Sequence, residues 1–386
     1  MACTWTTCIC WSPRCPKDLA GIEPAVMPSI RPLPGCTAKS RPAIVESALS
    51  KLVTIVLFSI VFFFAAGSVV AELTPPDHPA IGFSDHAGVS VSTSRVRFLR
   101  PIEGQGFEHC APGARVRFNT DSVWIKAHLY FNDLMTREDT YNGVVSILVD
   151  GKWHADFDPG AGRGAFYFSP IIRFWSRERR TIEIVLPYGA GVDFVGLSTR
   201  ADARLQPSEP RPARRIVVFG DSITQGYRAS SYRSSWPFIL GQSKTAEVVN
   251  LGFGSRATHA DDGLAVGQFN ADQILVALGH NDFRYQSDLA TLRARYQELL
   301  EHIRSGNRTA AIFAITPLWT SLQRPIPVSR YRTAIADAVA ATTDPGITLI
   351  NGLTLTAHGD ESFTDGTHPN DIGSATIAKR LSELLD

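Results

Sequence analysis

The sequence predicts an α/β domain with a five-stranded parallel sheet between helices, preceded by an antiparallel β-sandwich or jelly-roll domain. Two hydrophobic patterns predict this arrangement. Residues 80–205 contain short segments of period two separated by turn residues, which is typical of an antiparallel β domain. Residues 214–386 alternate strand-like and helical segments, which indicates βα units and a parallel sheet. The proline-rich segment 206–213 between them predicts a short, stiff linker.

Residues 1–71 differ from both domains and predict a leader segment. An apolar run covers residues 52–71 and ends in Val-Val-Ala, as before a signal-peptidase site. The run is also about long enough to span a bilayer uncleaved, so a retained membrane anchor is the alternative. Met27 would give such a signal a more ordinary start, and residues 1–26 would then come from a misassigned start. We expect an exported protein, periplasmic or extracellular.

The composition is that of a globular protein, with 44% hydrophobic residues, 19% charged residues and a net charge of +1. This charge gives no electrostatic reason to expect a nucleic acid as partner. Only Cys110 lies in the body of the chain, so we expect neither an internal disulfide nor a cysteine-rich metal site there. Cys8, Cys10 and Cys15 could be read as a metal cluster, but no predicted fold surrounds them. We expect no metal and no other cofactor.

Eight segments of the first domain suit short strands. Asp150-Gly151 lies between two apolar segments and is a strong hairpin signal. Trp124, Trp153, Tyr167 or Trp175 could stack on a sugar ring if exposed, but positions in the sandwich core are the favoured interpretation for most of them. The strand-like segments are 89–92, 95–99, 115–118, 123–131, 144–149, 165–168, 181–187 and 192–197.

The second domain predicts five strands and five helices. Leu292, Tyr296, Leu299 and Ile303 recur at helical spacing and mark one buried face of the longest helix. Strands are expected at 216–219, 247–251, 273–278, 310–315 and 347–350, and helices at 235–242, 262–269, 289–304, 329–341 and 371–385.

Ser222 follows the first of these strands directly, in the stretch Gly220-Asp-Ser, where a helix is about to begin. Open α/β sheets bind their ligands at the carboxyl ends of the strands. A hydroxyl there lies close to the unpaired backbone N–H groups of a helix start. We therefore expect Ser222 to be a nucleophile. Taken alone the motif is weak, because Asp and Ser are also good helix caps.

Three further polar stretches belong to the same domain. Asp365 and His368 share one loop, where a tight turn can bring the carboxylate onto the imidazole. Asn281 follows the third strand and can donate its amide N–H to an oxyanion. His280 beside it is a less favoured candidate for the base. The glycines of segment 250–255 let the backbone approach a bound group. Each stretch could be an ordinary turn, but together they predict a nucleophile, a base and oxyanion donors at one sheet edge.

These motifs resemble those of the SGNH (GDSL-type) hydrolases, in the usual order, over residues 215–385. Gly-Asp-Ser-Ile-Thr-Gln-Gly is similar to the nucleophile block, Gly-His-Asn-Asp to the Gly-x-Asn-Asp block and Asp-Gly-Thr-His to the Asp-x-x-His block. The resemblance implies a flavodoxin-like three-layer αβα fold. It also implies Ser222 as nucleophile, His368 as general base and acid, and Asp365 as orienting acid.

The same resemblance implies an oxyanion hole. Its donors would be the backbone N–H of Ser222, a backbone N–H in the Gly254–Ser255 turn and the side chain of Asn281. The family usually has Gly where Ser255 aligns, so which of Gly254 and Ser255 donates stays open. The preceding β domain is similar to the N-terminal jelly-roll module of bacterial SGNH esterases that deacetylate polysaccharides.

We therefore expect an exported serine esterase, and more specifically an acetylesterase that removes O-acetyl groups from a carbohydrate. Its partner would be a small-molecule or polysaccharide ester. The alternatives are a lysophospholipase or thioesterase of the same family, and a non-catalytic carbohydrate-binding envelope protein. The sugar, the acyl group, the role of the β domain and the oligomeric state stay open at this point.

Overall fold

The computed structural model describes residues 71–102, 110–134, 143–160, 164–211 and 213–385. They fall within one compact unit, Val69–Asp386. The predicted leader lies outside the described residues except for Ala71, and so do Cys8, Cys10 and Cys15. No helix within the described ranges is long and apolar enough to cross a membrane.

The C-terminal region contains a five-stranded sheet in which every neighbouring pair is parallel, as the sequence predicts. Its order is β15-β14-β16-β17-β18, which is the 2-1-3-4-5 order of flavodoxin-like sheets. Each predicted strand forms within two residues of its expected bounds. The strands are β14 (Arg215–Gly220), β15 (Glu247–Asn250), β16 (Gln273–Ala277), β17 (Ala311–Ile315) and β18 (Ile347–Ile350).

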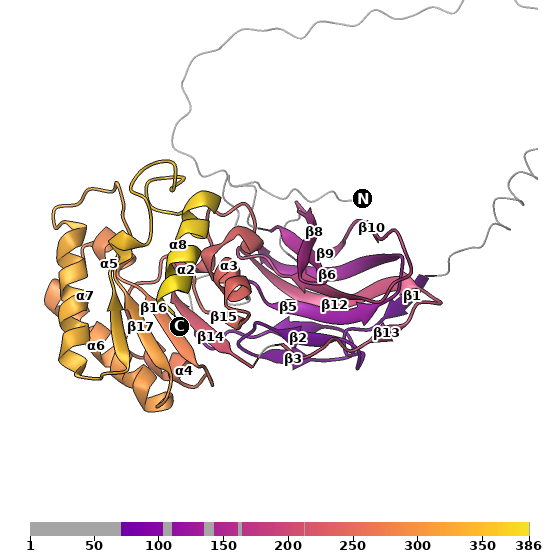
Figure 1. The fold of residues 1–386 in the computed structure, drawn as a ribbon, viewed down its shortest axis with the longest axis horizontal. Helices are drawn as coiled ribbons and strands as arrows, with labels where there is room; N and C mark the ends of the chain where they lie inside the picture. The colour runs from indigo at the N-terminus through magenta and orange to yellow at the C-terminus, as the bar shows by residue number, and fades with distance from the viewer. Residues whose placement is uncertain (1–70, 103–109, 135–142, 161–163, 212, 386) are drawn as a thin grey trace, which may run out of the picture. The chain divides into compact units, whose positions relative to one another are not determined.

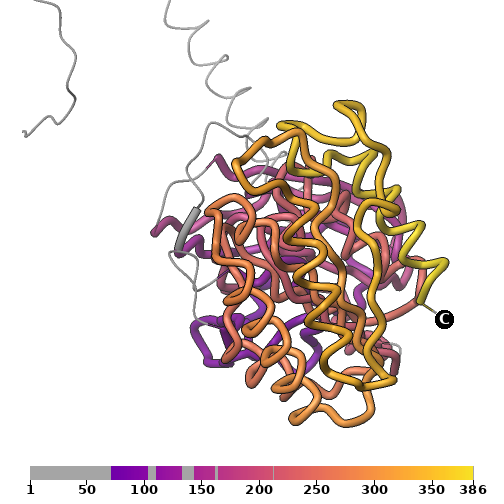
Figure 2. The backbone as a smooth tube through the Cα atoms, turned by 90° about the vertical axis from the view of Figure 1, so that its left-hand side faces the viewer, coloured from indigo at the N-terminus to yellow at the C-terminus, as the bar shows by residue number. Residues whose placement is uncertain are grey.

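Helices cover both faces of this sheet (Figures 1 and 2). Val217 and Phe219 of β14 belong to the apolar cluster with α4, α6 and α7, whereas Ile216 and Val218 belong to the cluster with α3 and α8. Alternate residues of one strand therefore face opposite helical layers, which confirms the three-layer prediction. The helices are α2 (Ser222–Gln225), α3 (Trp236–Ser243), α4 (Asp262–Gly267), α5 (His280–Tyr285), α6 (Leu289–Gly306), α7 (Val328–Thr342) and α8 (Asp371–Leu384).

Two antiparallel sheets form a sandwich in the N-terminal region, with a shared apolar core between them. The first, sheet A, contains β1 (Ala71–Thr74), β3 (Val89–Val91), β4 (Val96–Phe98), β6 (Trp124–Leu134), β9 (Ala165–Phe168), β10 (Ile172–Arg173) and β12 (Ala190–Arg200). The second, sheet B, contains β2 (Gly82–Ser84), β5 (Arg115–Thr120), β7 (Val145–Val149), β8 (Lys152–Phe157), β11 (Arg180–Val185) and β13 (Leu205–Gln206). Strand β1 pairs with β12. Sheet A therefore includes residues that lie before the predicted start of the β domain at residue 80.

The hairpin between β7 and β8 forms at Asp150-Gly151, where the sequence predicts it. Both residues have positive φ angles, 50° and 77°, as a two-residue type I′ turn requires. The Asp150 side chain also accepts a hydrogen bond from the backbone N–H of Thr181 at 2.8 Å, which ties the hairpin to β11.

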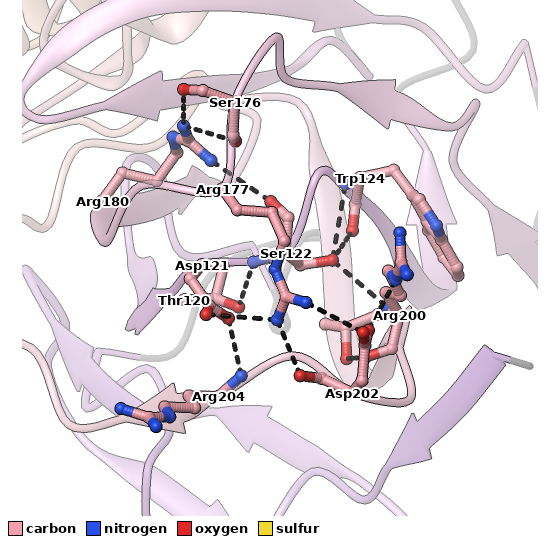
Figure 3. Close-up of polar contacts among 11 residues, drawn as sticks. Thr120, Asp121, Ser122, Trp124, Ser176, Arg177, Arg180, Arg200, Asp202 and Arg204 are labelled. Carbon is pink, nitrogen blue, oxygen red and sulfur yellow. Dashed lines mark hydrogen bonds and ion pairs between the residues drawn. The ribbon is translucent and has the colours of Figure 1, made fainter. Parts of the chain in front are cut away.

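An arginine–carboxylate network joins three loops at one end of the sandwich (Figure 3). Arg177 donates to the carboxylates of Asp202 and Asp121 at 2.8 and 3.2 Å. Asp121 also accepts from the backbone N–H of Arg204 at 2.7 Å. The network connects strands of both sheets, although exposed ion pairs of this kind each add little stability.

The core interpretation is wrong for two of the four aromatic residues considered above. Trp175 is fully exposed and Trp153 is 57% exposed. Trp153 lies in β8, which is at the edge of sheet B, and Trp175 lies in the loop before β11. Neither side chain belongs to the shared apolar core of the sandwich. Trp124 and Tyr167 are half-buried.

The sandwich packs on the α/β region through buried charged groups. Arg115 of β5 forms ion pairs with Asp85 and Glu183, at 3.2 and 2.7 Å. Asp85 in turn accepts a hydrogen bond from the backbone N–H of Val248 in β15, and its own N–H donates to Glu247. Buried charges are costly unless they are paired and hydrogen-bonded, so these contacts fix how the two regions meet.

Candidate active site

The turn that carries Ser222 is formed by the end of β14 and the start of α2. Asp221 caps the helix, since its Oδ1 accepts a hydrogen bond from the backbone N–H of Ile223 at 2.9 Å. A Cβ atom at Gly220 would lie 2.2 Å from Oγ1 of Thr224, so the helix can begin this tightly only after glycine. Asp221 therefore fulfils the capping role, and the Ser222 hydroxyl is left for another partner.

That partner is His368. Its Nε2 lies 2.9 Å from Oγ of Ser222, and its Nδ1 lies 2.8 Å from Oδ2 of Asp365. The structure thus brings together the three residues predicted as nucleophile, base and orienting acid, from loops 146 residues apart. An imidazole held by a carboxylate on one nitrogen can accept the serine proton on the other.

The Asp365 carboxylate is fixed by its own loop. Its Oδ1 accepts hydrogen bonds from the backbone N–H groups of Thr367 and His368, at 3.2 and 2.9 Å. Gly366, with φ of +71°, makes the tight turn that brings carboxylate and imidazole together. Burial opposes ionisation of Asp365, but its hydrogen bonds to His368 and the nearby charge of Arg228 outweigh this and lower the pKa of the carboxyl group.

His280, the less favoured base, is placed differently. It is only 5% exposed, and neither ring nitrogen has a hydrogen-bond partner among the described residues. Burial, with the nearby charge of His368, lowers the pKa of His280 to about 3, so its ring is neutral. His280 borders a cavity of about 30 Å³ together with Asp221. It does not hydrogen-bond to Ser222, which favours His368 as the base.

The predicted oxyanion donors surround α2. The backbone N–H of Ser222 is at the first position of this helix, where N–H groups have no partner within the helix. Gly254 and Ser255 form a turn, and Ser255 has a φ of +65°, in the left-handed region that favours glycine. The serine thus adopts the backbone angle expected of the glycine that the family usually has here. Which of the two residues donates stays a prediction.

Asn281 lies on the short helix α5 rather than in a loop, because the helix begins at His280. Its Nδ2 lies 3.0 Å from the backbone oxygen of Arg256 and 3.4 Å from Oδ2 of Asp221. The amide is therefore beside the residue that precedes Ser222, as the predicted role requires. Its role as an oxyanion donor stays a prediction, since the amide is here directed to protein acceptors.

No group of three or more His, Cys, Asp or Glu side chains that could hold a metal ion occurs in the described part of the chain. Asp262 pairs with Arg256, and Asp282 accepts hydrogen bonds from Thr258. Cys110 is buried and is not in a disulfide.

Two residues after α2, Tyr227 and Arg228, contact the loop of Asp365 and His368, and the sequence did not predict them. The ring of Tyr227 contacts that of His368 edge-on, with centroids 4.7 Å apart. Nε of Arg228 lies 3.4 Å from Oδ2 of Asp365, and Arg228 has a φ of +78°. Strained backbone angles of this kind cluster at functional sites. Tyr-Arg after a glycine carries no motif, so only the structure shows these contacts.

Replacing Arg228 with glutamine is expected to raise the pKa of the Asp365 carboxyl group, because the nearby charge of Arg228 is one of the interactions that lower it. The midpoint of the Asp365 titration, followed by NMR of its carboxyl group, measures this change. Arg233→Gln is the matched control, because Arg233 forms its ion pair with Asp156 and not with Asp365. An unchanged midpoint in Arg228→Gln would contradict this electrostatic role.

Residues 218–376 match the model of the GDSL-like Lipase/Acylhydrolase family. The matched segment contains Ser222, Asn281, Asp365 and His368. The C-terminal region is a GDSL-like lipase/acylhydrolase domain. This confirms the resemblance to SGNH (GDSL-type) hydrolases that the motifs predict. None of the curated proteins compared with the chain matches its sequence.

Solved structures with the same fold include the sandwich as well as the GDSL-like domain. A salicylyl-acyltransferase from a tetracycline biosynthetic pathway is 16% identical, with a TM-score of 0.71, over 82% of this chain and 96% of that one. A family two carbohydrate esterase from Clostridium thermocellum, in complex with cellohexaose, is 14% identical, with a TM-score of 0.64, over 79% and 98%. An acetyl xylan esterase of the rumen bacterium Butyrivibrio proteoclasticus is 13% identical, with a TM-score of 0.61, over 82% and 98%.

Proposed function

We propose that this chain is a serine esterase that removes O-acetyl groups from a carbohydrate. The observation that carries the proposal is the continuous hydrogen-bonded series from Asp365 through His368 to Oγ of Ser222. A serine hydroxyl is a weak nucleophile unless a neighbouring base takes its proton. This arrangement provides that base in a GDSL-like domain, whose family description is that of acylhydrolases.

The reaction proceeds by two acyl transfers. Oγ of Ser222 attacks the ester carbonyl carbon while its proton passes to Nε2 of His368. The tetrahedral oxyanion is stabilised by the N–H of Ser222, the N–H of Gly254 or Ser255, and the amide of Asn281. His368 returns the proton to the departing alcohol oxygen, which leaves an acyl-serine. His368 then takes a proton from water, whose oxygen attacks the acyl carbon. The bond from this carbon to Oγ of Ser222 breaks, His368 returns the proton to Oγ, and the carboxylic acid is released.

The proposed substrate rests on the combination of two regions. Carbohydrate esterases of family two share the fold of both regions with this chain, and one of them was solved with cellohexaose bound. Another similar structure is described as an acetyl xylan esterase. Such likeness at low identity supports the choice of an acetylated polysaccharide. The predicted export signal at 52–71 is consistent with it, because such polymers lie outside the cell, and we propose an exported enzyme.

A panel of esters tests the proposal. A chain that starts at Ala71, the first residue of β1, is incubated with acetylated polysaccharides, with p-nitrophenyl esters of increasing acyl length, and with a lysophospholipid. We expect acetate release from at least one polysaccharide and faster hydrolysis of the acetate ester than of the octanoate ester.

Two results would contradict the proposal. Preferred hydrolysis of the lysophospholipid would favour the lysophospholipase alternative. Hydrolysis of no ester, with no labelling of Ser222 by a fluorophosphonate, would favour a non-catalytic binding protein. Adding an alcohol as acyl acceptor tells hydrolysis from acyl transfer, because only transfer forms a new ester.

A further inference from the structure

An arginine of the sandwich region contacts a loop of the GDSL-like domain. Arg100 lies two residues after β4, and its NH2 group donates a hydrogen bond to the backbone oxygen of Gly252 at 2.6 Å. Its NH1 group donates to the backbone oxygen of Cys110 at 3.2 Å. The guanidinium also lies 4.7 Å from the centre of the Phe253 ring. Arg100 thus connects the sandwich to the segment that leads into the Gly254–Ser255 turn.

The segment that contains Gly252 and Phe253 is packed tightly against α2, the helix that begins at Ser222. The backbone N–H of Gly252 donates to Oδ1 of Asn250 at 2.8 Å, and that of Phe253 donates to the backbone oxygen of Gly220 at 3.2 Å. A Cβ atom at Gly252 would lie 2.4 Å from the backbone nitrogen of Gln225 in α2. A shift of Gly252 would therefore also move the peptide groups that follow it.

Two arginine guanidinium groups lie close to the ring of Phe253, and one of them is that of Arg100. The guanidinium of Arg256 lies 4.8 Å from the centre of the same ring and forms an ion pair with Asp262. Arg256 belongs to the GDSL-like domain, whereas Arg100 comes from the sandwich. The hydrogen bond from Arg100 to the backbone oxygen of Gly252 fixes one peptide plane of this segment directly.

The hydrogen bond from Arg100 to Gly252 has a cationic donor. Burial lowers the pKa of Arg100 to about 10, so the group is still a cation at neutral pH. Hydrogen bonds from a cationic donor are roughly twice as strong as those between neutral groups. A buried carbonyl that loses such a donor pays the full desolvation penalty or moves to find another partner.

We propose that Arg100 is a positioning residue for the oxyanion hole. By holding the carbonyl of Gly252, it keeps the Gly254–Ser255 turn in the place where a backbone N–H group faces the developing oxyanion. The sandwich region then takes part in catalysis and is more than an accessory module. This inference rests on the proposed esterase mechanism and extends it, since Arg100 acts only through the turn.

The test uses the full chain with Arg100→Gln and Arg100→Lys. Kinetics with p-nitrophenyl acetate give kcat and KM. A boronic acid, which forms a tetrahedral adduct with Ser222, measures how well the oxyanion hole binds a transition-state analogue. We expect kcat to fall by about 10- to 100-fold in Arg100→Gln, less than for removal of a donor itself, with KM nearly unchanged. The inhibition constant of the boronic acid should rise in parallel, and Arg100→Lys should lie between.

Arg97→Gln is the matched control, because Arg97 lies in β4 and pairs with Asp193, which is in sheet A. It should keep wild-type kcat and boronic acid affinity. Thermal unfolding shows whether each variant is folded. If Arg100→Gln does not fold, Arg100→Lys, which keeps a cation in place, is used for the test instead. Wild-type kcat and boronic acid affinity in a folded Arg100 variant would overturn the inference. So would a fall in stability or a rise in KM with kcat unchanged.

Failure of the proposed function looks different. In that case the wild-type chain itself neither hydrolyses the acetate ester nor reacts with a fluorophosphonate at Ser222. An active wild type with unaffected Arg100 variants overturns only the positioning role.

Discussion

Replacing Ser222 with alanine is expected to reduce hydrolysis of a chromogenic acetate ester by about 10⁵- to 10⁶-fold. The reason is that no acyl-enzyme can form without Oγ, and His368 then has no hydroxyl from which to take a proton. Steady-state rates at saturating ester give the loss. A fluorophosphonate should label the wild-type chain at Ser222 and fail to label the variant.

Ser230→Ala is the control for this experiment. Ser230 lies in the segment after α2, and its hydroxyl donates to Asp371 at 2.6 Å rather than to the histidine. The variant loses a serine hydroxyl, as Ser222→Ala does, but one that is bonded to Asp371, so it should stay active and reactive to the probe. Full activity in Ser222→Ala would rule out the serine mechanism, and loss of activity in both variants would point to damage of the fold.

The architecture of the GDSL-like domain could be predicted well because buried parallel strands read as short apolar runs. Ile216 to Phe219 contact helices on both faces, which leaves no polar position in the run. The short strands of the sandwich could not all be predicted. β10 and β13 have only two residues each, and they form because β6 and β5 lie beside them in the folded chain. A local pattern contains no information about such neighbours.

The residues of the site also fall into those that the sequence predicts and those that it does not. Ser222, Asp365 and His368 lie in short motifs whose residue types follow from the chemistry, so the sequence predicts them and the structure brings them together. Arg100 and Arg228 carry no motif. They contact the active-site loops from 152 and 137 residues away in the sequence, counted to Gly252 and Asp365 (252 minus 100, 365 minus 228), and only the packing of the chain determines them.

Replacing Asp365 with asparagine is expected to lower kcat for the acetate ester by about 10³- to 10⁴-fold. Oδ1 of Asp365 accepts two backbone N–H groups, so the oxygen of the asparagine should keep that position. The amide NH₂ would then face Nδ1 of His368, where Oδ2 now lies at 2.8 Å. A donor at this place stabilises the tautomer that carries its proton on Nε2, and this tautomer cannot accept the proton of Ser222.

Asp371→Asn separates this effect from a general loss of charge near the site. Asp371 begins α8 and accepts hydrogen bonds from the N–H and hydroxyl of Ser230, at 2.7 and 2.6 Å, so its side chain is not bonded to His368. The variant should keep activity within a few-fold of the wild type, while both variants keep a similar melting temperature. Nearly full activity in Asp365→Asn would show that the imidazole holds its productive tautomer without the carboxylate.

The lowered pKa of Asp365 adds a further expectation with a definite sign. Because this carboxyl group stays ionised well below its ordinary range, its own protonation should not lower kcat/KM in the pH range where an ordinary aspartate titrates, and kcat/KM measured across that range checks this.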